Sequence, residues 1–421
     1  MRADLRPAAP GGDAAGTGAA PFVVWALYAF VASLPFEFPN RTIPLETTTL
    51  TGAVFLVASL LQPQVCYRRP PASFWLFAAY MYAILVSFAV NGAEYPQETI
   101  KTLITRGQLV LIFLVAYNLM RDARVARNSL VIFGIACALL AALTLTGVVG
   151  MEEVDKPRLT AFGQNPNRAA VVVGSGLLAL LGTAFVGVRP PFRPRLLAVG
   201  LAGCAGAAVL ATGSRGGLLA LTIGLGTLTL GGRGFKVRAR SAVLALVGIA
   251  ALVWAVSRSP LMVERLQRAQ QGDLAGREAI FPLVWGMVQE RPLFGWGTAG
   301  NSYELAIRIS DGVHVSRDTH NLVLELFTTV GLVGALPFLA AVTWCVLAAW
   351  RARHGPIGIV PFALCAALMA GNMSGNYIGV KLLWFVLAVA MASGRLVPAA
   401  ATPAPPPPAP RRQPWTLPTA G

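Results

Sequence analysis

The chain has 421 residues, of which 55% are hydrophobic and only 12% are charged, and its formal net charge is +16. Repeated apolar runs of about 17 to 25 residues are long enough to cross the ~30 Å of bilayer hydrocarbon as helices. The runs are continuous rather than alternating, which excludes a membrane barrel and favours helices. The composition therefore predicts an all-α polytopic membrane protein.

Hydropathy predicts about twelve transmembrane helices, which form one membrane domain over residues 21–397. A large polar loop, residues 258–320, separates spans nine and ten. Residues 1–20 are rich in Ala, Gly and Pro and are expected to be disordered, as is the proline-rich tail, residues 398–421. The expected spans are residues 21–38, 46–62, 72–90, 102–119, 128–149, 167–187, 195–211, 214–230, 240–257, 321–349, 356–373 and 378–396.

The basic residues predict the orientation, because Lys and Arg concentrate in cytoplasmic connections. Every second connection is rich in Arg, as at residues 68–69 and 121–127, and this alternation places both termini in the cytoplasm. The positive charge is therefore explained by topology, and no nucleic-acid partner is expected. The segments at 150–166 and 258–320 then face outward.

The large outer loop carries two helical patterns. Residues 259–271 are polar with an apolar stripe, and residues 276–290 place Ile280, Val284, Met287 and Val288 on one face. The second pattern predicts a helix that lies on the membrane or caps a cavity. A glycine-rich turn is expected to follow at residues 291–304.

Neither a disulfide framework nor a metal site is expected. Four of the five cysteines lie within apolar runs, Cys66 flanks one, and no CxxC pair occurs. The outer segments lack the metal-binding patterns DxD and HExxH. The acidic run at residues 152–155 comes nearest to such a pattern, but a solvated turn explains it equally well. The chain also lacks GxxxxGK[ST], so neither a metal nor a cofactor is expected.

Several arginines stand at the outer ends of the expected spans. Charges at membrane depth usually face the protein interior or a watery cavity, and guanidinium groups match phosphate oxygens bidentately. Arg158 and Arg277 lie in the two outer segments, and Arg215 lies in TGSRGG at the mouth of span eight. Each arginine has an alternative role, contact with lipid headgroups or with an acid. That alternative is favoured for Arg106, just inside span four, and for Arg168, but not for Arg215.

His320 stands where the large loop meets the tenth span. A neutral imidazole, with an ordinary pKa of about 6.5, is the usual general base near neutral pH. A histidine at this position has a simpler alternative role as a helix cap or an interfacial residue. The neighbouring Asp318 and Asn321 are candidates to orient the ring, which favours the catalytic interpretation. His314 lies in mid-loop and is expected to be solvated.

Four short motifs between residues 150 and 350 occur in an informative order. They are RLTAFGQNPN before span six, TGSRGG at the start of span eight, GREAIF and RPLFGWGTAGN in the large loop, and HNLVLELFTTVGLVG. Together they resemble the O-antigen ligase family of bacterial membrane glycosyltransferases. The last one matches the His-Asn-x9-Gly-x2-Gly pattern of the lipopolysaccharide ligases at His320, Asn321, Gly331 and Gly334. The first four spans resemble the family only in hydropathy.

The resemblance implies a metal-independent enzyme of the bacterial inner membrane, with the large loop over a cavity that faces the periplasm. Family members transfer a glycan from undecaprenyl diphosphate to an acceptor hydroxyl, such as one on lipid A-core. For this chain the resemblance implies that His320 is the base and that Arg215 and Arg277 bind diphosphate, with Arg158 as a further contact. The expected supporting residues are Asn321, Asp318 and Arg106.

Two alternatives remain open at this point. An O-antigen or exopolysaccharide polymerase shares the motifs and uses a second lipid-linked repeat unit as its acceptor. A transporter would account for the many spans, but transporters typically show internal repeats or spans broken at matching places, and the sequence shows neither. The expected partners are the lipid-linked donor, a lipid or glycan acceptor and the bilayer.

Overall fold

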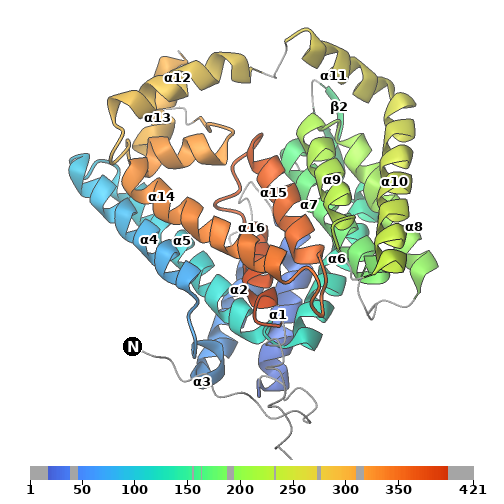
Figure 1. Cartoon of the computed structure of the whole chain (residues 1–421). Coiled ribbons are helices and arrows are strands. Elements are labelled where there is room, and N and C mark those ends of the chain that lie inside the picture. The colour runs from blue at the N-terminus through green and yellow to red at the C-terminus, as the bar shows by residue number, and fades with distance from the viewer. Residues whose placement is uncertain are drawn as a thin grey trace, which may run out of the picture.

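The computed structural model describes residues 18–37, 46–153, 156–162, 164–186, 194–231, 234–272, 276–309 and 317–396. It is an all-α membrane protein with one small hairpin (Figure 1). The first half contains α1 (Pro21–Ser33), η1 (Leu34–Phe36), α2 (Thr47–Leu60), α3 (Pro63–Cys66), α4 (Ala72–Val90), α5 (Pro96–Leu119), α6 (Ala123–Leu145), β1 (Gly150–Glu153), β2 (Lys156–Ala161), α7 (Pro166–Leu181), η2 (Gly182–Val186) and α8 (Arg195–Ala211). The second half contains α9 (Arg215–Leu228), α10 (Phe235–Ser257), α11 (Pro260–Gln270), α12 (Arg277–Glu290), α13 (Gly300–Arg308), α14 (Leu322–Arg351), α15 (Val360–Asn372) and α16 (Lys381–Ser393).

Each of the twelve expected spans coincides with an apolar helix. Six helical segments are long and apolar enough to cross a membrane, namely α4, α5, α6, α7 with η2, α10 and α14. The other six are shorter apolar helices, namely α1 with η1, α2, α8, α9, α15 and α16. The all-α membrane fold is thus confirmed, while complete crossing by the shorter helices stays a prediction.

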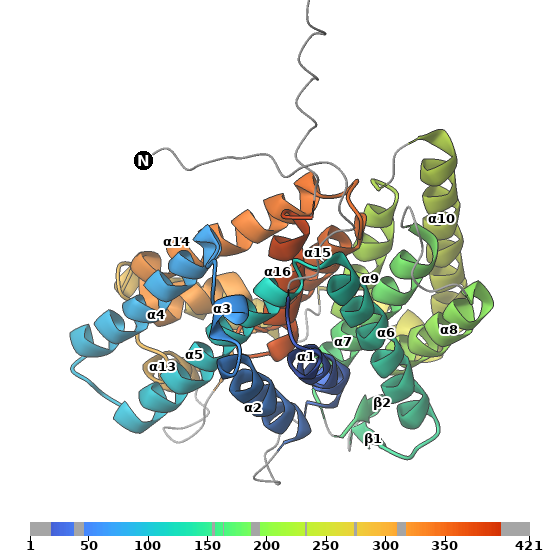
Figure 2. The same ribbon diagram turned by 90° about the horizontal axis from the view of Figure 1, so that it is seen from below.

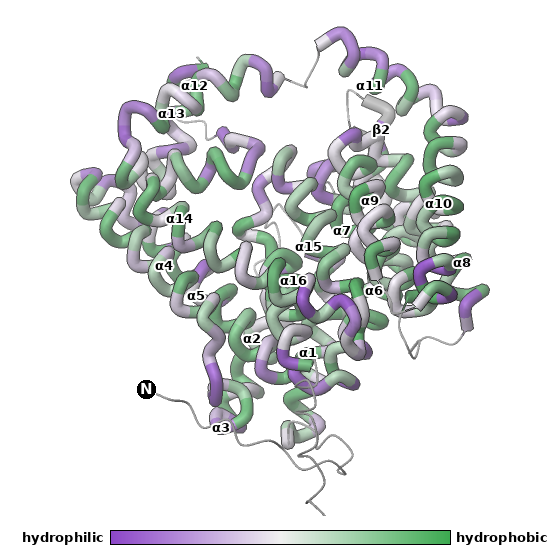
Figure 3. The backbone as a smooth tube through the Cα atoms, in the orientation of Figure 1, coloured by the Kyte–Doolittle hydropathy of each residue, from purple (hydrophilic) through white to green (hydrophobic). Residues whose placement is uncertain are grey.

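The large loop folds into helices that arch over one end of the bundle. Figure 1 shows α11 and α12 above the level of α9 and α14, and Figure 3 shows that they are more hydrophilic than the bundle. The prediction for residues 259–271 and 276–290 is confirmed by α11 and α12. Val284 and Met287 of α12 pack with Leu305 of α13, and Ile280 lies against them.

Two local expectations were incomplete. The glycine-rich turn expected over 291–304 ends earlier, because α13 begins at Gly300. The outer segment after span five contains an antiparallel hairpin in which Met151 pairs with Thr160. Residues 1–17, the tail from 397 onward and His314 lie outside the described residues, so the expectations about them are untested.

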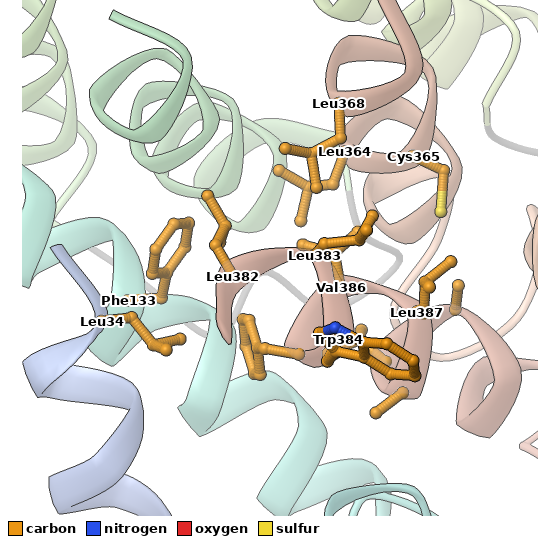
Figure 4. Packing of buried hydrophobic residues seen from close by; sticks show 14 of the residues in the cluster. Leu34, Phe133, Leu364, Cys365, Leu368, Leu382, Leu383, Trp384, Val386 and Leu387 are labelled. Carbon is orange, nitrogen blue, oxygen red and sulfur yellow. The ribbon is translucent and has the colours of Figure 1, made fainter. Parts of the chain in front are cut away.

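The core centres on α16, whose residues after Lys381 are all buried. Trp384 packs against Phe77 of α4 in a tilted arrangement with ring centroids 4.8 Å apart, and the ring centroid of Phe338 of α14 lies 5.4 Å from that of Phe77. Figure 4 shows Trp384 beneath Leu364 and Leu368 of α15, and Phe133 of α6 on the other side of α16 beside Leu382. Figure 2 shows α4, α5 and α14 side by side around this centre. This packing fixes the start of α16, where the candidate site lies.

Helix α14 breaks at Gly331, and the break holds the loop to the bundle. Gly331 has φ +59°, and a Cβ atom there would lie 2.3 Å from the backbone of Leu293. The backbone amides of Trp296 and Gly297 donate to the carbonyls of Thr328 and Thr329 at 2.7 and 2.9 Å. The loop backbone thus satisfies carbonyl groups that the broken helix leaves free. Two motifs of the sequence, RPLFGWG and TTVGLVG, are therefore joined in space.

Candidate active site

The connector between α15 and α16, residues 373–380, is the point where the candidate residues meet. Arg277 at the start of α12 donates from Nη2 to the carbonyl of Ser374 at 2.9 Å. Asn321, which follows His320, donates from Nδ2 to the carbonyl of Met373 at 3.5 Å. The connector thus brings the start of α12 and the start of α14 to adjacent residues.

The start of α9 packs on the same connector. A Cβ atom on Gly216 would lie 2.3 Å from the hydroxyl oxygen of Ser374, and one on Gly217 would lie 2.3 Å from the Cβ of Ala170. The hydroxyl of Ser214 caps the helix by accepting from the amide of Gly217 at 3.0 Å. The glycines of TGSRGG are therefore required for close approach, and this approach places Arg215 beside the connector.

Arg215 and Arg277 form a pair of cations. Arg215 donates from Nη1 to the carbonyl of Arg265 in α11 at 3.1 Å, so both arginines also tie the loop helices to the bundle. Burial and the positive charge of Arg215 together lower the pKa of the Arg277 guanidinium. The buried Nε of Arg277 has no hydrogen-bond partner among the described residues. An anion with several oxygens would complete this arrangement.

His320 is held in an unusual backbone conformation. Its φ is +53°, in the left-handed region that few non-glycine residues adopt. Its backbone amide donates to Oδ1 of Asp318 at 2.9 Å, and its side chain is partly exposed. Strain of this kind persists where the surroundings dictate it, and it often marks a functional residue. The backbone conformation of His320 therefore fixes the position of the imidazole at the junction between the loop and α14.

Asp318 and Asn321 act on the backbone in this structure, and no contact between either side chain and the imidazole ring is seen among the described residues. Oδ1 of Asn321 accepts from the amides of Val323 and Leu324 at 2.9 and 3.2 Å and so caps α14. In this structure the two side chains thus shape the turn that carries His320, and the expectation that they orient the ring stays a prediction.

Glu325, which the sequence analysis did not single out, stabilises the turn that carries His320. The buried Thr319 hydroxyl donates to Oε2 of Glu325 at 2.9 Å, and it also lies 3.1 Å from the carbonyl of Asn321. Thr329 reaches the other oxygen of Glu325 at 3.4 Å. Glu325 therefore holds the residue immediately before His320. A lone acid in the first turn of an apolar helix was the available signal.

Arg158 lies behind the site rather than on it. Only 6% of its surface is exposed, and Nε donates to the carbonyl of Thr212 at 2.9 Å. Its Nη2 also lies 3.5 Å from Oδ1 of Asn167, which accepts from Ser214 at 2.8 Å. The geometry favours a bracing role for Arg158 beneath the turn that presents Arg215, and direct contact with diphosphate remains only a prediction.

Arg106 lies on the other side of the connector. Its Nη1 is 2.9 Å from the position a Cβ would take on Gly379, and that nitrogen is buried without a partner among the described residues. Its charge acts on Glu325 and on the buried Tyr80. Arg168, by contrast, forms an ion pair with Glu37, which confirms the structural interpretation for that residue.

Tyr377 of the connector was also missed. Its hydroxyl group donates to the carbonyl of Asn167 at 3.4 Å, and its side chain is buried. Burial raises the pKa of this hydroxyl group, while the nearby charges of Arg168 and Arg277 oppose the increase. The run GNMSGNYIG, which interrupts two apolar stretches, was the available sequence signal for the whole connector.

Comparison with known proteins points to one family. Residues 199–339, from within α8 to a point in α14 past Gly331, match the family model described as O-antigen ligase. Over this range the chain resembles O-antigen ligases. It is also 26% identical over 332 residues to an O-antigen ligase of Pseudomonas aeruginosa, which covers 77% of this chain and 78% of that protein.

The matched range contains Arg215, Arg277 and His320, the three candidate residues near the connector. Arg158 lies before the matched range and Arg106 lies far outside it. Within the described residues, no group of three or more His, Cys, Asp or Glu side chains is placed to hold a metal ion. Separately, the apolar helices and the resemblance to O-antigen ligases indicate a multi-pass bacterial membrane protein of transferase type.

Proposed function

We propose that the chain transfers a glycan from undecaprenyl diphosphate to an acceptor hydroxyl, such as one on lipid A-core, at the periplasmic face of the inner membrane. One observation carries the proposal. The side chain of Arg277, the start of α9 that bears Arg215, and the turn bearing His320 meet at residues 373–374. A diphosphate leaving group is stabilised by positive charges, and a hydroxyl nucleophile is activated by a base.

The arginine pair supplies the electrostatic part of the reaction. As the bond between the anomeric carbon and the diphosphate oxygen breaks, the bonding electrons remain on the diphosphate. Fixed cations that face the departing group stabilise that charge without reorganising. The positive charge of Arg215 opposes that of Arg277, and a bound diphosphate would relieve this repulsion.

His320 supplies the base. The acceptor oxygen attacks the anomeric carbon from the face opposite the diphosphate, and its proton passes to an imidazole nitrogen of His320. General base catalysis of this kind contributes about 10² to 10⁴ in rate. Because the leaving group is already a weak base, no general acid is required, and the arginines take the place of a metal ion. EDTA is accordingly expected to leave the rate unchanged.

A bacterial strain in which the gene is deleted tests the proposal. Its surface polysaccharide is resolved on gels and its lipid-linked glycans are extracted, with wild type, His320→Ala or Arg268→Ala supplied on a plasmid. Arg268 is an exposed residue of α11 paired with Glu264, so Arg268→Ala is the matched control. Long polymer on undecaprenyl diphosphate beside bare lipid A-core is expected in the deletion strain and with His320→Ala.

The other outcomes distinguish the alternatives. Single repeat units on the lipid carrier would identify a polymerase, which uses the same chemistry on a different acceptor. Unchanged surface and lipid-linked glycans in the deletion strain would rule out both functions. Chelator-sensitive transfer by the purified protein would contradict the metal-independent mechanism.

A further inference from the structure

We infer that a cavity between α2, α5 and α16 binds the sugar head group of the acceptor glycolipid. The inference rests on the proposed function and assigns its second substrate to a separate site. The cavity has a volume of about 540 Å³, which lies within the range of small-molecule sites, about 300 to 1,000 Å³. Its polar lining residues include Glu37, Glu46, Thr49, Lys101, Gln108 and Lys381.

The floor of the cavity has balanced charge. Lys381 donates to Oε1 of Glu37 at 3.0 Å and lies 3.5 Å from Oε2 of Glu46, while Arg168 pairs with the other oxygen of Glu37. The lining of the cavity holds two acids, Glu37 and Glu46, and two lysines, Lys101 and Lys381, so it has no excess of positive charge that would favour a diphosphate. Carboxylate, amide and hydroxyl groups close together are suited to the hydroxyl groups of a neutral sugar.

One atom of the floor is available for a ligand. Glu46 is 7% exposed, and its Oε2 accepts from the hydroxyl of Thr49 at 3.0 Å. Its Oε1 is buried and has no hydrogen-bond partner among the described residues. A buried carboxylate oxygen without a donor is costly, and a sugar hydroxyl entering the cavity would satisfy it.

The walls of the cavity are apolar and open toward lipid. Ile100 and Ile104 of α5 line the cavity, yet 56% and 58% of their surfaces are exposed. In the membrane this flank of α5 faces lipid near the outer surface, as the charge-derived orientation predicts. A ligand that reaches the polar floor past these side chains therefore has an apolar part in the bilayer and a sugar part in the cavity.

A second cavity adjoins the first. It has a volume of about 340 Å³ and shares Lys101, Thr105 and Gly379 with the first. It is also lined by Ser302, whose carbonyl accepts from the amide of Arg317, three residues before His320, at 3.1 Å. We therefore expect an acceptor glycan anchored in the first cavity to extend along the second toward the turn of His320.

Acceptor and donor kinetics test the inference on the full-length protein in lipid nanodiscs. The acceptor probe is rough lipopolysaccharide, which carries lipid A-core without O-chains, and the donor is an undecaprenyl-diphosphate glycan. Ile104→Trp fills the cavity and Gln108→Leu removes a polar lining group. Each is expected to raise the KM for the acceptor about tenfold, with the KM for the donor unchanged.

Leu111→Trp is the matched control. Leu111 lies on the same helix, is 41% exposed and is not among the residues that line the cavity. It is expected to change neither KM. An unchanged acceptor KM in Ile104→Trp, or an equal rise in both KM values, would overturn the inference.

A crosslinking measurement separates this inference from the proposed function. A benzophenone amino acid at position 104 is expected to capture rough lipopolysaccharide in cells, and the same group at position 111 is not. Capture at 104 without any transfer in nanodiscs would support the cavity and contradict the proposed function. Capture of only phospholipid or of the undecaprenyl donor at 104 would overturn the acceptor site.

Discussion

At the scale of single residues, His320 combines a partly exposed imidazole with a left-handed backbone. Asn tolerates this conformation better than most residues, so His320→Asn removes the base while preserving the turn. We expect His320→Asn and His320→Ala to reduce the rate of transfer alike, by about 10² to 10⁴. Rates are measured on purified protein whose thermal unfolding temperature is compared with that of wild type. Near wild-type activity in His320→Asn would show that His320 serves only the backbone.

The arginine pair is expected to bind an anion such as pyrophosphate even when no glycan is transferred. Inorganic pyrophosphate at 100 times its dissociation constant is expected to raise the free energy of unfolding by about 2.7 kcal/mol. Arg277→Ala is expected to abolish this increase, because Arg277 carries a buried donor without a partner among the described residues. Calorimetry with and without pyrophosphate measures the effect, and Arg268→Ala should respond like wild type. An equal response in Arg277→Ala would place the anion elsewhere.

The sequence identified these residue types but not all of their partners. His320, Arg215 and Arg277 were predicted from motif and membrane depth, and the structure brings them to one connector. Arg158 was predicted as a ligand, yet it donates to the carbonyl of Thr212. The direction of a guanidinium group depends on which carbonyls the folded chain leaves beside it, and residues 54 positions apart give no local signal of that contact.

At the scale of elements, the break in α14 joins the loop to the helix that carries His320. Gly331→Ala places a Cβ 2.3 Å from the Leu293 backbone at φ +59°, so we expect a loss of at least about 2 kcal/mol in unfolding free energy. Denaturation in detergent compares this variant with Gly107→Ala. Gly107 lies within α5 with nothing near its Cβ position, so alanine there should stabilise by about 0.5 to 1 kcal/mol. Equal stabilities would contradict the account of the break.

Helix positions were predictable because long apolar runs in a membrane allow little else. The break at Gly331 was not, because the run HNLVLELFTTVGLVGALPF is continuous in hydropathy. The helix opens there only because the loop backbone at residues 292–297 replaces its internal hydrogen bonds. The glycines of both segments are the trace of this contact in the sequence. The two segments lie more than thirty positions apart, so the glycines alone do not show that they pair.

At the scale of the whole molecule, the account depends on which side of the membrane carries the arch of α11 and α12. A cysteine at Gln271 is expected to react with an impermeant maleimide in cells with a permeable outer membrane. A cysteine at Arg68 is expected to react only after lysis, because the basic connections face the cytoplasm. Both variants are made in a cysteine-free background. The reverse pattern would place the arginine pair in the cytoplasm and contradict the orientation.

In the proposed arrangement the two substrates occupy different places around one connector. The proposed diphosphate site lies between α9 and α12, and the proposed acceptor cavity lies between α2, α5 and α16. The connector contributes Ser374 to the first site and Gly379 to the second, and the buried packing around Trp384 holds α16 in place. We expect the two substrates to meet at the turn of His320.

The most direct measurement is transfer by the purified protein in nanodiscs, given an undecaprenyl-diphosphate glycan and rough lipopolysaccharide. Products are resolved on gels, and released undecaprenyl diphosphate is measured in the same samples. The account predicts equal amounts of glycan-bearing lipopolysaccharide and undecaprenyl diphosphate with wild type, and neither with His320→Asn or Arg277→Ala. Undiminished transfer by both variants would contradict the account, because the charges and the base at the connector would then not perform the reaction.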